Sequence, residues 1–449
     1  AGEFSLEQAV GIASMVKSDR LQMALIAREI EHKLQIAVQV SGAEAEAAIL
    51  GALTTPGTTR PLAILDLGAG STDASIINAQ GEISATHLAG AGDMVTMIIA
   101  RELGLEDRYL AEEIKKYPLL TQIGSRRAET LVGRYDKNKE GVYDGKPYGG
   151  FYTQEEIREI VRYAAERHIE VIPEIEMPGH GLAALTAYPW LGCTGGPYAV
   201  WTHWGISDDV YCAGKETTFE FIEKVLTEVL ALFPSKLIHI GGDECPKGRW
   251  KACPLCQQRI REEGLKDEYQ LQSYFIHRIE RWMHAHGREI IGWDEILQGG
   301  ISKTANIMSW NGSDPGIKAA QRGNPVIMTP KWYCYFDYSQ TSDPERYEPL
   351  GSTRYVSVRQ AYRLDPCDRL TPPDQRRIKG VQCNLWTEYI ADIRHAQHMV
   401  LPRMAALAET GWANDRKDYN DFVRRIPALV AVYKAEGYNY APYLFEGIE

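Results

Sequence analysis

The sequence predicts an α/β protein in which a (β/α)8 TIM-barrel-type domain follows a smaller α/β segment. Between residues 171 and 383, six short apolar runs occur, several of them separated by amphipathic helical patterns, which is typical of a parallel sheet with right-handed crossovers. The composition also changes along the chain: only two aromatic residues, Phe4 and Tyr109, precede Glu112, whereas all eight cysteines follow it. We therefore expect two modules of different origin, with a boundary in residues 112–119.

Length and charge restrict the kinds of protein that this chain can be. A chain of 449 residues is too long for one ordinary core and favours two domains. A net charge of -11 argues against nucleic acid or an anionic membrane surface as a partner, because either would favour a basic patch. No apolar stretch is long enough to cross a membrane, and the N-terminus has no secretion-signal pattern. We expect a neutral or small substrate; the oligomeric state is not predicted.

The N-terminal module is predicted to extend over residues 5–112. Residues 1–4 have the character of a cloning scar, ahead of a Ser5-x-x-Gln8 capping box. Helical spacing predicts two helices in residues 5–35, a strand at 36–40 and a helix at 43–50. A strand, a glycine-rich turn and a second strand are predicted over residues 61–77, with a third strand at 82–88.

The glycine-rich turn has the pattern Asp66-x-Gly68-x-Gly70-Ser-Thr-Asp73. Backbone amides in such a turn can cradle a phosphate, and a flanking Asp can hold Mg²⁺ through water. The alternative is an ordinary tight turn. The pattern resembles the second phosphate loop of the actin and Hsp70 ATPase fold.

A wider stretch, residues 42–119, resembles part of the large subunit of the diol dehydratase reactivating factor, a chaperone-like ATPase of that fold. The resemblance implies that residues 5–112 are a partial actin-like ATPase module. It offers an alternative function, an ATP-binding reactivating factor for a B12-dependent diol dehydratase. The first phosphate loop of that family has no counterpart upstream, so we expect only half of a nucleotide cleft.

The second module, residues 113–449, is predicted to be built from alternating helices and strands. Thr153-x-x-Glu156 is a capping box that opens a helix ending near residue 168. Further helices are expected at 218–233 and 269–286. The apolar runs predict strands at 171–175, 237–240, 289–292, 305–309, 325–328 and 379–383. Six strands are most of an eight-stranded barrel.

The run at 237–244 ends in Gly241-Gly242-Asp243-Glu244. In barrels of this type, substrate chemistry collects at the carboxyl ends of the strands. Neighbouring side chains of a regular strand point to opposite faces, so both acids enter one pocket only where the two glycines break the strand. The alternative is that Asp243 and Glu244 cap the next helix.

Aromatic and acidic residues also follow the other predicted strands. Indole faces stack on the C–H face of a sugar, and carboxylates accept its hydroxyl protons. A sugar-binding site is therefore predicted at this end of the barrel, with rim packing as the alternative for any single tryptophan. The residues concerned are His180, Trp293, Trp310, Tyr335, Asp337, Trp386 and Glu388.

Four motifs in this module resemble family 20 glycoside hydrolases, the exo-acting β-N-acetylhexosaminidases. They are Pro-Glu-Ile-Glu-Met-Pro-Gly-His from Pro173, His-Ile-Gly-Gly-Asp-Glu from His239, Gly-Trp-Asp-Glu from Gly292 and Leu-Trp-Thr-Glu from Leu385. The resemblance extends over residues 113–449. It implies glycans with a terminal β-linked N-acetylglucosamine or N-acetylgalactosamine as substrates, and a substrate-assisted mechanism without metal or cofactor.

The resemblance also implies a role for each site residue. Glu244 is expected to be the general acid, and Asp243 to orient the 2-acetamido group and stabilise the oxazolinium that it forms. Three tryptophans would wall the acetamido pocket, Tyr335 would donate to the acetamido carbonyl, and His180 would support the two acids. Sugar hydroxyls would be bound by Asp337 and Glu388, and the pocket walls would be Trp293, Trp310 and Trp386.

Two features of the hydrolase family are missing from this sequence. The family carries an Arg and a His-x-x-Asp-Asp-Gln-Gly-Trp segment on its first two strands, and neither is found where it is expected. We therefore expect a chimera whose barrel lacks its first two strands. The hydrolase resemblance implies a periplasmic or secreted protein, whereas the N-terminal resemblance implies a cytoplasmic one.

Cys253-Pro-Leu-Cys256, with Cys245 nearby, has the form of a redox or zinc motif. A single Cys-x-x-Cys without a second pair is weak support for a metal. The sequence therefore favours a structural disulfide or free thiols.

Overall fold

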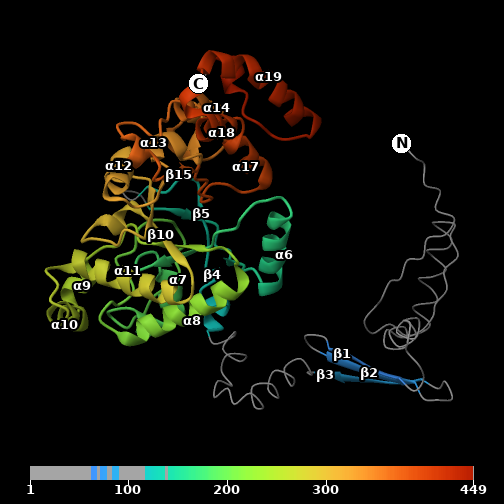
Figure 1. The fold of residues 1–449 in the computed structure, drawn as a ribbon, viewed down its shortest axis with the longest axis vertical. Helices are drawn as coiled ribbons and strands as arrows, with labels where there is room; N and C mark the ends of the chain where they lie inside the picture. The colour runs from blue at the N-terminus through green and yellow to red at the C-terminus, as the bar shows by residue number, and fades with distance from the viewer. Residues whose placement is uncertain (1–61, 68–70, 78–82, 90–116, 137–139, 448–449) are drawn as a thin grey trace. The chain divides into compact units, whose positions relative to one another are not determined.

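The computed structural model describes residues 62–67, 71–77, 83–89, 117–136 and 140–447 (Figure 1). The chain divides into two compact units, Ala1–Lys116 and Tyr117–Glu449. The elements predicted in residues 5–50, the Ser5 capping box and the loop glycines Gly68 and Gly70 lie outside the described residues.

The described part of the first unit is a three-stranded antiparallel sheet. Its strands are β1 (Leu62–Leu67), β2 (Ser71–Ile77) and β3 (Ile83–Ala89), in the order β1-β2-β3. Asp66 and Asp73 are paired directly across the β1–β2 ladder. The predicted succession of three strands is confirmed here.

The second unit contains a six-stranded parallel sheet. Its order is β15-β12-β11-β10-β9-β8, with β8 and β15 at the two ends of the order. The sequential strands are neighbours, as in a barrel wound from consecutive β-α units. The strands are β8 (Glu174–Met177), β9 (Leu237–Gly241), β10 (Glu289–Trp293), β11 (Asn306–Ser309), β12 (Val326–Met328) and β15 (Ile378–Val381).

The first strand of this sheet begins later than predicted. We expected residues 171–175, but β8 is Glu174–Met177. Pro173 has no N–H group to donate, although its carbonyl accepts from the His239 amide at 2.9 Å. Glu176 therefore lies inside the strand rather than beyond its end, and alternation places it on the same face as Glu174.

The long helices agree closely with the sequence pattern. α6 (Gln154–Ala165) has the complete predicted capping box, in which Thr153 and Glu156 exchange hydrogen bonds. α8 (Glu216–Leu232) and α11 (Glu268–Ala285) contact each other. The helices α17 (Ile393–Val400), α18 (Arg403–Ala413) and α19 (Tyr419–Ala435) form the C-terminal end of this unit (Figure 1).

Shorter elements occupy the connections. They are α5 (Leu119–Gln122), β4 (Arg126–Arg127), β5 (Leu131–Val132), β6 (Val142–Tyr143), β7 (Tyr148–Gly149), α7 (Leu182–Ala187), η2 (Pro189–Leu191), α9 (Gly248–Ala252), α10 (Pro254–Glu262), η3 (Asp294–Leu297), α12 (Ser313–Arg322), α13 (Lys331–Cys334), β13 (Tyr338–Ser339), α14 (Pro344–Tyr347), β14 (Ser352–Tyr355), α15 (Val358–Tyr362), α16 (Pro372–Gln375), η4 (Asn414–Arg416) and α20 (Tyr443–Glu446).

Two apolar cores hold the second unit together. The larger one joins the sheet to α8 and α11 and contains Ile238, Leu226 and Phe275, which are fully buried. The smaller one lies under the C-terminal helices, around Phe336. Beside it, the buried Arg403 guanidinium donates to five backbone carbonyls, over which its charge is dispersed. They are the carbonyls of Phe336, Tyr338, Ser339, Val356 and Met399.

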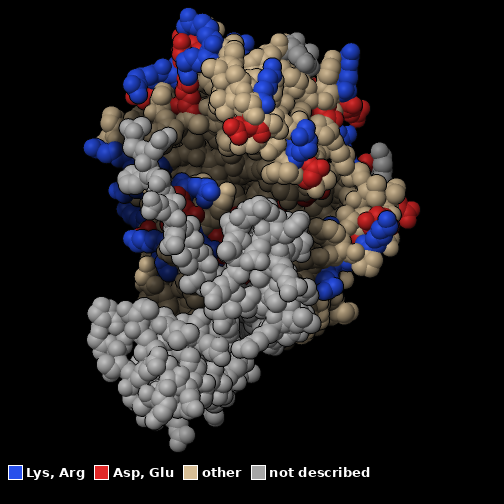
Figure 2. Space-filling model, turned by 90° about the vertical axis from the view of Figure 1, so that its right-hand side faces the viewer, with Lys and Arg blue, Asp and Glu red and all other residues tan. Residues whose placement is uncertain are grey.

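The outer surface is mixed in charge. On the face shown in Figure 2, Lys and Arg side chains of the described residues lie interspersed with Asp and Glu side chains. Among the described helices, none is both long enough and apolar enough to cross a membrane.

Candidate active site

The two adjacent acids lie at the point where β9 breaks. Gly241 and Gly242 have φ values of 68° and 94°, and Glu244 has a φ of 41°. Left-handed backbone is readily available to glycine and rarely adopted by Glu, so the glycines are needed for this turn. The next helix, α9, begins at Gly248 with Lys247 as its N-cap. The helix-capping alternative for Asp243 and Glu244 is therefore wrong.

His180 bridges both acids from the neighbouring strand end. Its Nε2 atom lies 3.5 Å from Asp243 Oδ2 and 3.4 Å from Glu244 Oε2. Hydrogen bonds to Asp243 and then to Glu244 raise the pKa of the His180 imidazole to about 10. A cationic imidazole therefore joins the side chains of the two acids.

The turn that carries His180 packs directly against the acid pair. A Cβ atom at Gly179 would lie 3.0 Å from the Asp243 carbonyl oxygen. Only a glycine allows the backbones to approach this closely without a shift. The strand ends of β8 and β9 are thus fixed to each other by main-chain contact as well as by charge.

Glu176 is a site residue that the sequence analysis did not single out. A Cβ atom at Gly241 would overlap its Oε2 atom, which is buried and has no hydrogen-bond partner among the described residues. Burial, and then the charge of Asp243, raise the pKa of the Glu176 carboxyl to about 10. An uncharged carboxyl therefore lies beside Asp243. The signal for it was the alternation Glu-Ile-Glu-Met in an apolar strand, which puts two acids on one face.

The four predicted aromatic residues form a continuous chain of rings. Trp293 lies 6.0 Å from Trp386 between ring centroids, Trp386 lies 6.5 Å from Tyr335, and Tyr335 stacks at 6.1 Å on Trp310. Trp386 is 38% exposed, whereas Trp293 is 2% exposed. The chain of rings is thus buried at Trp293 and exposed to solvent at Trp386.

Two carboxylates that the sequence analysis gave no role orient these indoles. Trp293 Nε1 donates to Glu174 Oε1 at 2.8 Å, and Trp310 Nε1 donates to Glu295 Oε2 at 2.8 Å. Burial, and then the charge of Asp294, raise the pKa of Glu295 to about 7. Asp294 itself is buried and accepts from the Trp310 backbone amide at 2.9 Å.

Asp337 and Glu388 approach each other from the two remaining strand ends. Burial raises the pKa of Asp337 to about 7, and the negative charge of Glu388 adds to the effect. Asp337 Oδ1 and Asp243 Oδ1 are both buried without a hydrogen-bond partner among the described residues. Buried carboxylate oxygens are normally paired, so both atoms are suited to accept from donors on a ligand.

Similarity to known proteins agrees with this geometry. Residues 107–415 match the catalytic domain of glycosyl hydrolase family 20. The chain belongs to this family. A β-hexosaminidase from Porphyromonas gingivalis is 47% identical over 338 residues, which are 75% of this chain and 42% of that protein. The structure of an exo β-N-acetylglucosaminidase from Vibrio harveyi in complex with N-acetylglucosamine superposes with a TM-score of 0.63 at 33% identity, covering 73% of this chain and 51% of that one.

The N-terminal part has a different relationship. Residues 1–128 match the ATPase-like domain of diol dehydratase reactivase. Over 119 residues the chain is 92% identical to the large subunit of the propanediol dehydratase-reactivating factor of Salmonella typhimurium, covering 26% of this chain and 20% of that protein. This chain therefore spans less than half the length of the Porphyromonas gingivalis relative and less than half the length of the Salmonella typhimurium relative.

Within the family 20 domain, the nine predicted site residues lie at the carboxyl ends of strands of the one sheet or in the segments that follow them. His180 follows β8, the acid pair follows β9, and Trp310 follows β11. Trp293 is the last residue of β10 rather than the first after it. Tyr335 and Asp337 follow α13, and a parallel bridge from Tyr335 to Asn384 aligns them with the segment that carries Trp386.

His180, Asp243 and Glu244 also bring three possible metal-ligand side chains together. One ligand atom from each of His180, Asp243 and Glu244 lies within 4.8 Å of the others. However, the His180 Nε2 atom that faces both carboxylates carries a proton at neutral pH, because its pKa is raised to about 10. An imidazole nitrogen must lose its proton before it can bind a metal, so this group is better suited to hydrogen bonding.

Proposed function

We propose that the family 20 domain releases terminal β-linked N-acetylhexosamine from glycans by substrate-assisted, retaining hydrolysis. The observation that carries the proposal is the adjacent pair Asp243 and Glu244, held by one cationic His180, with Asp243 Oδ1 buried and unpaired. The named relatives support it, since one is a β-hexosaminidase and another is an exo β-N-acetylglucosaminidase observed with N-acetylglucosamine.

In the proposed reaction, the carboxyl of Glu244 gives its proton to the glycosidic oxygen as the C1–O bond breaks. The carbonyl oxygen of the 2-acetamido group attacks C1 and forms a cyclic oxazolinium. Asp243 accepts a hydrogen bond from the acetamido N–H and offsets the positive charge of this intermediate. A water molecule then gives its proton to Glu244 and attacks C1, which opens the ring with net retention.

The aromatic residues would supply the shape of the pocket. Trp293, Trp310 and Trp386 are proposed to enclose the acetamido methyl group, whose burial excludes water from the internal nucleophile. Burial raises the pKa of Tyr335, so its hydroxyl keeps the proton that it would donate to the acetamido carbonyl. The carboxylates of Asp337 and, at the exposed edge, Glu388 would accept hydroxyl protons of the sugar.

The test is hydrolysis of p-nitrophenyl N-acetyl-β-D-glucosaminide and its galactosaminide epimer by the full chain. Asp243→Asn and Glu244→Gln are each expected to lower kcat by about 10²–10⁴, the range for loss of a charge-stabilising or a general-acid group. Glu220→Gln, on the exposed face of α8, is the matched control and should leave turnover unchanged. Folded wild-type protein without turnover, or unchanged turnover in both acid variants, would refute the proposal.

A further inference from the structure

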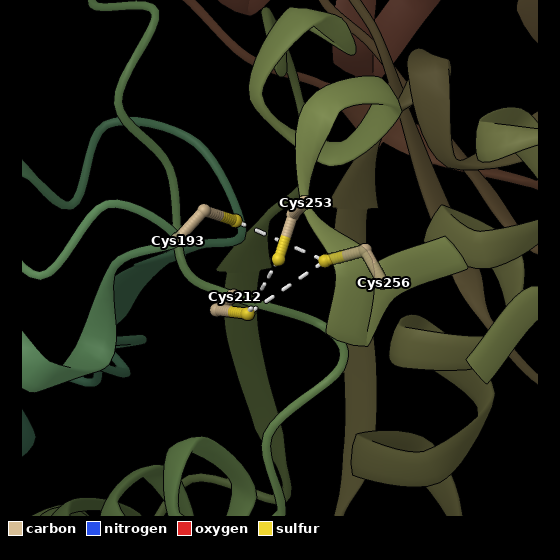
Figure 3. A group of neighbouring side chains, drawn as sticks. All are labelled: Cys193, Cys212, Cys253 and Cys256. Atoms are coloured by element: carbon tan, nitrogen blue, oxygen red, sulfur yellow. Dashed lines mark hydrogen bonds between the residues drawn. The ribbon is translucent and has the colours of Figure 1, made fainter. Parts of the chain in front are cut away.

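Four cysteines from three separate segments come together in the second unit (Figure 3). Cys193 follows η2, Cys212 lies in the loop before α8, and Cys253 and Cys256 are at the start of α10. Their side chains converge, and all four sulfur atoms lie within 4.8 Å of one another. Cys245, the sequence neighbour of Glu244, is not a member of this cluster.

The spacing of the sulfur atoms fits a shared ion better than a covalent bond. Cys212 Sγ lies 3.6 Å from Cys256 Sγ and 3.8 Å from Cys253 Sγ, and Cys193 Sγ lies 3.8 Å from Cys256 Sγ. Four sulfurs at about 2.3 Å from a tetrahedral zinc ion are about 3.8 Å apart. A disulfide needs about 2.05 Å. Three edges of the sulfur tetrahedron therefore already have the length that zinc requires.

The first pair of cysteines is held in place by main-chain contacts. An antiparallel bridge joins Gly192 to Tyr211, the residues directly before Cys193 and Cys212. The Cys212 amide donates to the Leu191 carbonyl at 2.8 Å. This pairing brings two cysteines together although 18 residues separate them in the sequence, so no short spacing pattern announced them.

The second pair is locked against the first by close packing. A Cβ atom at Gly214 would lie 2.5 Å from the Cys256 amide nitrogen, so the chain after Cys212 runs directly over the Cys-x-x-Cys turn. Trp250 Nε1 donates to the Tyr211 carbonyl at 2.9 Å. Cys253 is the N-cap of α10, where the unpaired helix amides favour negative thiolates.

We propose that Cys193, Cys212, Cys253 and Cys256 bind one structural Zn²⁺ ion. The donors are four soft sulfur atoms, a set that selects zinc or iron among the common metals. Four thiolates fill the tetrahedral coordination of zinc, so no position is left for substrate, as expected for a structural zinc site. Cys212 and Cys256 are fully buried, Cys253 is 5% exposed and Cys193 is half-buried.

The proposed ion would act on the catalytic centre through the loop that carries Cys212. The Tyr211 amide donates to the Pro178 carbonyl at 3.0 Å, and a Cβ atom at Gly181 would lie 2.7 Å from the Tyr211 ring. The loop that carries Cys212 therefore supports the turn that carries His180. The zinc site is a separate claim from the proposed hydrolase activity, and its tests below do not depend on turnover.

The test is metal analysis of the full chain, purified without metal-affinity chromatography or chelators. Mass spectrometry of the metal content is expected to find about one zinc per chain, and X-ray absorption a shell of four sulfurs at about 2.3 Å. Cys253→Ser and Cys256→Ser should each lose most of the zinc, whereas Cys367→Ser, outside the cluster, should keep it.

The outcomes that overturn the proposal are also measurable on the wild-type protein, whether or not the serine variants fold. Two disulfides, seen as a mass four hydrogens lower before reduction, would do so. Eight reactive thiols in protein that carries no metal would do so as well, and so would stoichiometric iron in place of zinc.

Discussion

Gly241→Ala tests whether the acid pair depends on the close approach of β8 and β9. Gly241 has a φ of 68°, and a Cβ atom there would overlap Glu176 Oε2. The Glu176 Oε2 atom is buried, and the charge of Asp243 acts on this carboxyl, so we expect a displacement of Glu176 to disturb the acid pair. The substitution is therefore expected to damage both stability and catalysis.

The magnitude follows from two separable terms. An alanine in the left-handed region costs about 1–2 kcal/mol, and overpacking of a buried contact adds about 1–3 kcal/mol. Gly287→Ala is the matched control, because Gly287 has a φ of 71° and a Cβ atom there would meet nothing within 4 Å. The free energy of unfolding should fall by about 2–5 kcal/mol at Gly241 and by about 1–2 kcal/mol at Gly287.

Urea denaturation at neutral pH measures both losses, and hydrolysis of the aryl N-acetylglucosaminide measures kcat for the same proteins. Gly241→Ala should lower kcat, whereas Gly287→Ala should not. Equal destabilisation by the two substitutions would show that the Glu176 contact carries no energy. Full kcat in folded Gly241→Ala would show that the acid pair does not depend on this approach.

Three further predictions concern charge. The raised pKa of His180 stabilises the fold fully below about pH 6.5 and ceases to do so as pH rises through about 10, so His180→Asn should cost about 3 kcal/mol more near pH 6 than near pH 10.5 in denaturation curves; a pH-independent loss would contradict the ion pairing with Asp243 and Glu244. The raised pKa of Glu176 costs stability increasingly above about pH 4.5, so Glu176→Gln should be neutral near pH 4 and stabilising near pH 8, and a constant effect would exclude a protonated carboxyl. Arg403→Met leaves buried carbonyls unpaired and should lower the free energy of unfolding by about 3–5 kcal/mol, measured by urea; a loss under 1 kcal/mol would show that water replaces the guanidinium.

Much of the barrel was predictable because its signals are local. Apolar runs ending in Gly, Trp or Pro mark buried strands, and the capping box at Thr153 marks the start of α6. The break after β9 was predictable from two adjacent glycines, which supply the positive φ angles that bring Asp243 and Glu244 to one place. Consecutive parallel strands have their carboxyl ends at the same edge of the sheet, so the residues that follow them are predicted to lie close together.

The features that the sequence did not predict depend on contacts between distant segments. β8 begins only after Pro173, so Glu176 is a half-buried strand residue close to Asp243 rather than the loop residue that we expected. Cys193 and Cys212 meet through a bridge between irregular segments, and irregular backbone carries no periodic pattern. In both cases the feature depends on a contact between segments that are far apart in the sequence. Secondary-structure propensity and the spacing of residues in the sequence do not predict such contacts.

The protonation pattern around Asp243 explains why the two acids can be adjacent. A neutral carboxyl from Glu176 lies on one side and the cationic imidazole of His180 on the other, so two of the neighbouring groups add no negative charge. The proposed oxazolinium would carry its positive charge close to Asp243. In the proposed reaction, Asp243 would therefore meet no repulsion from Glu176 and would offset the positive charge that develops on the acetamido group, which would stabilise the transition state more than the ground state.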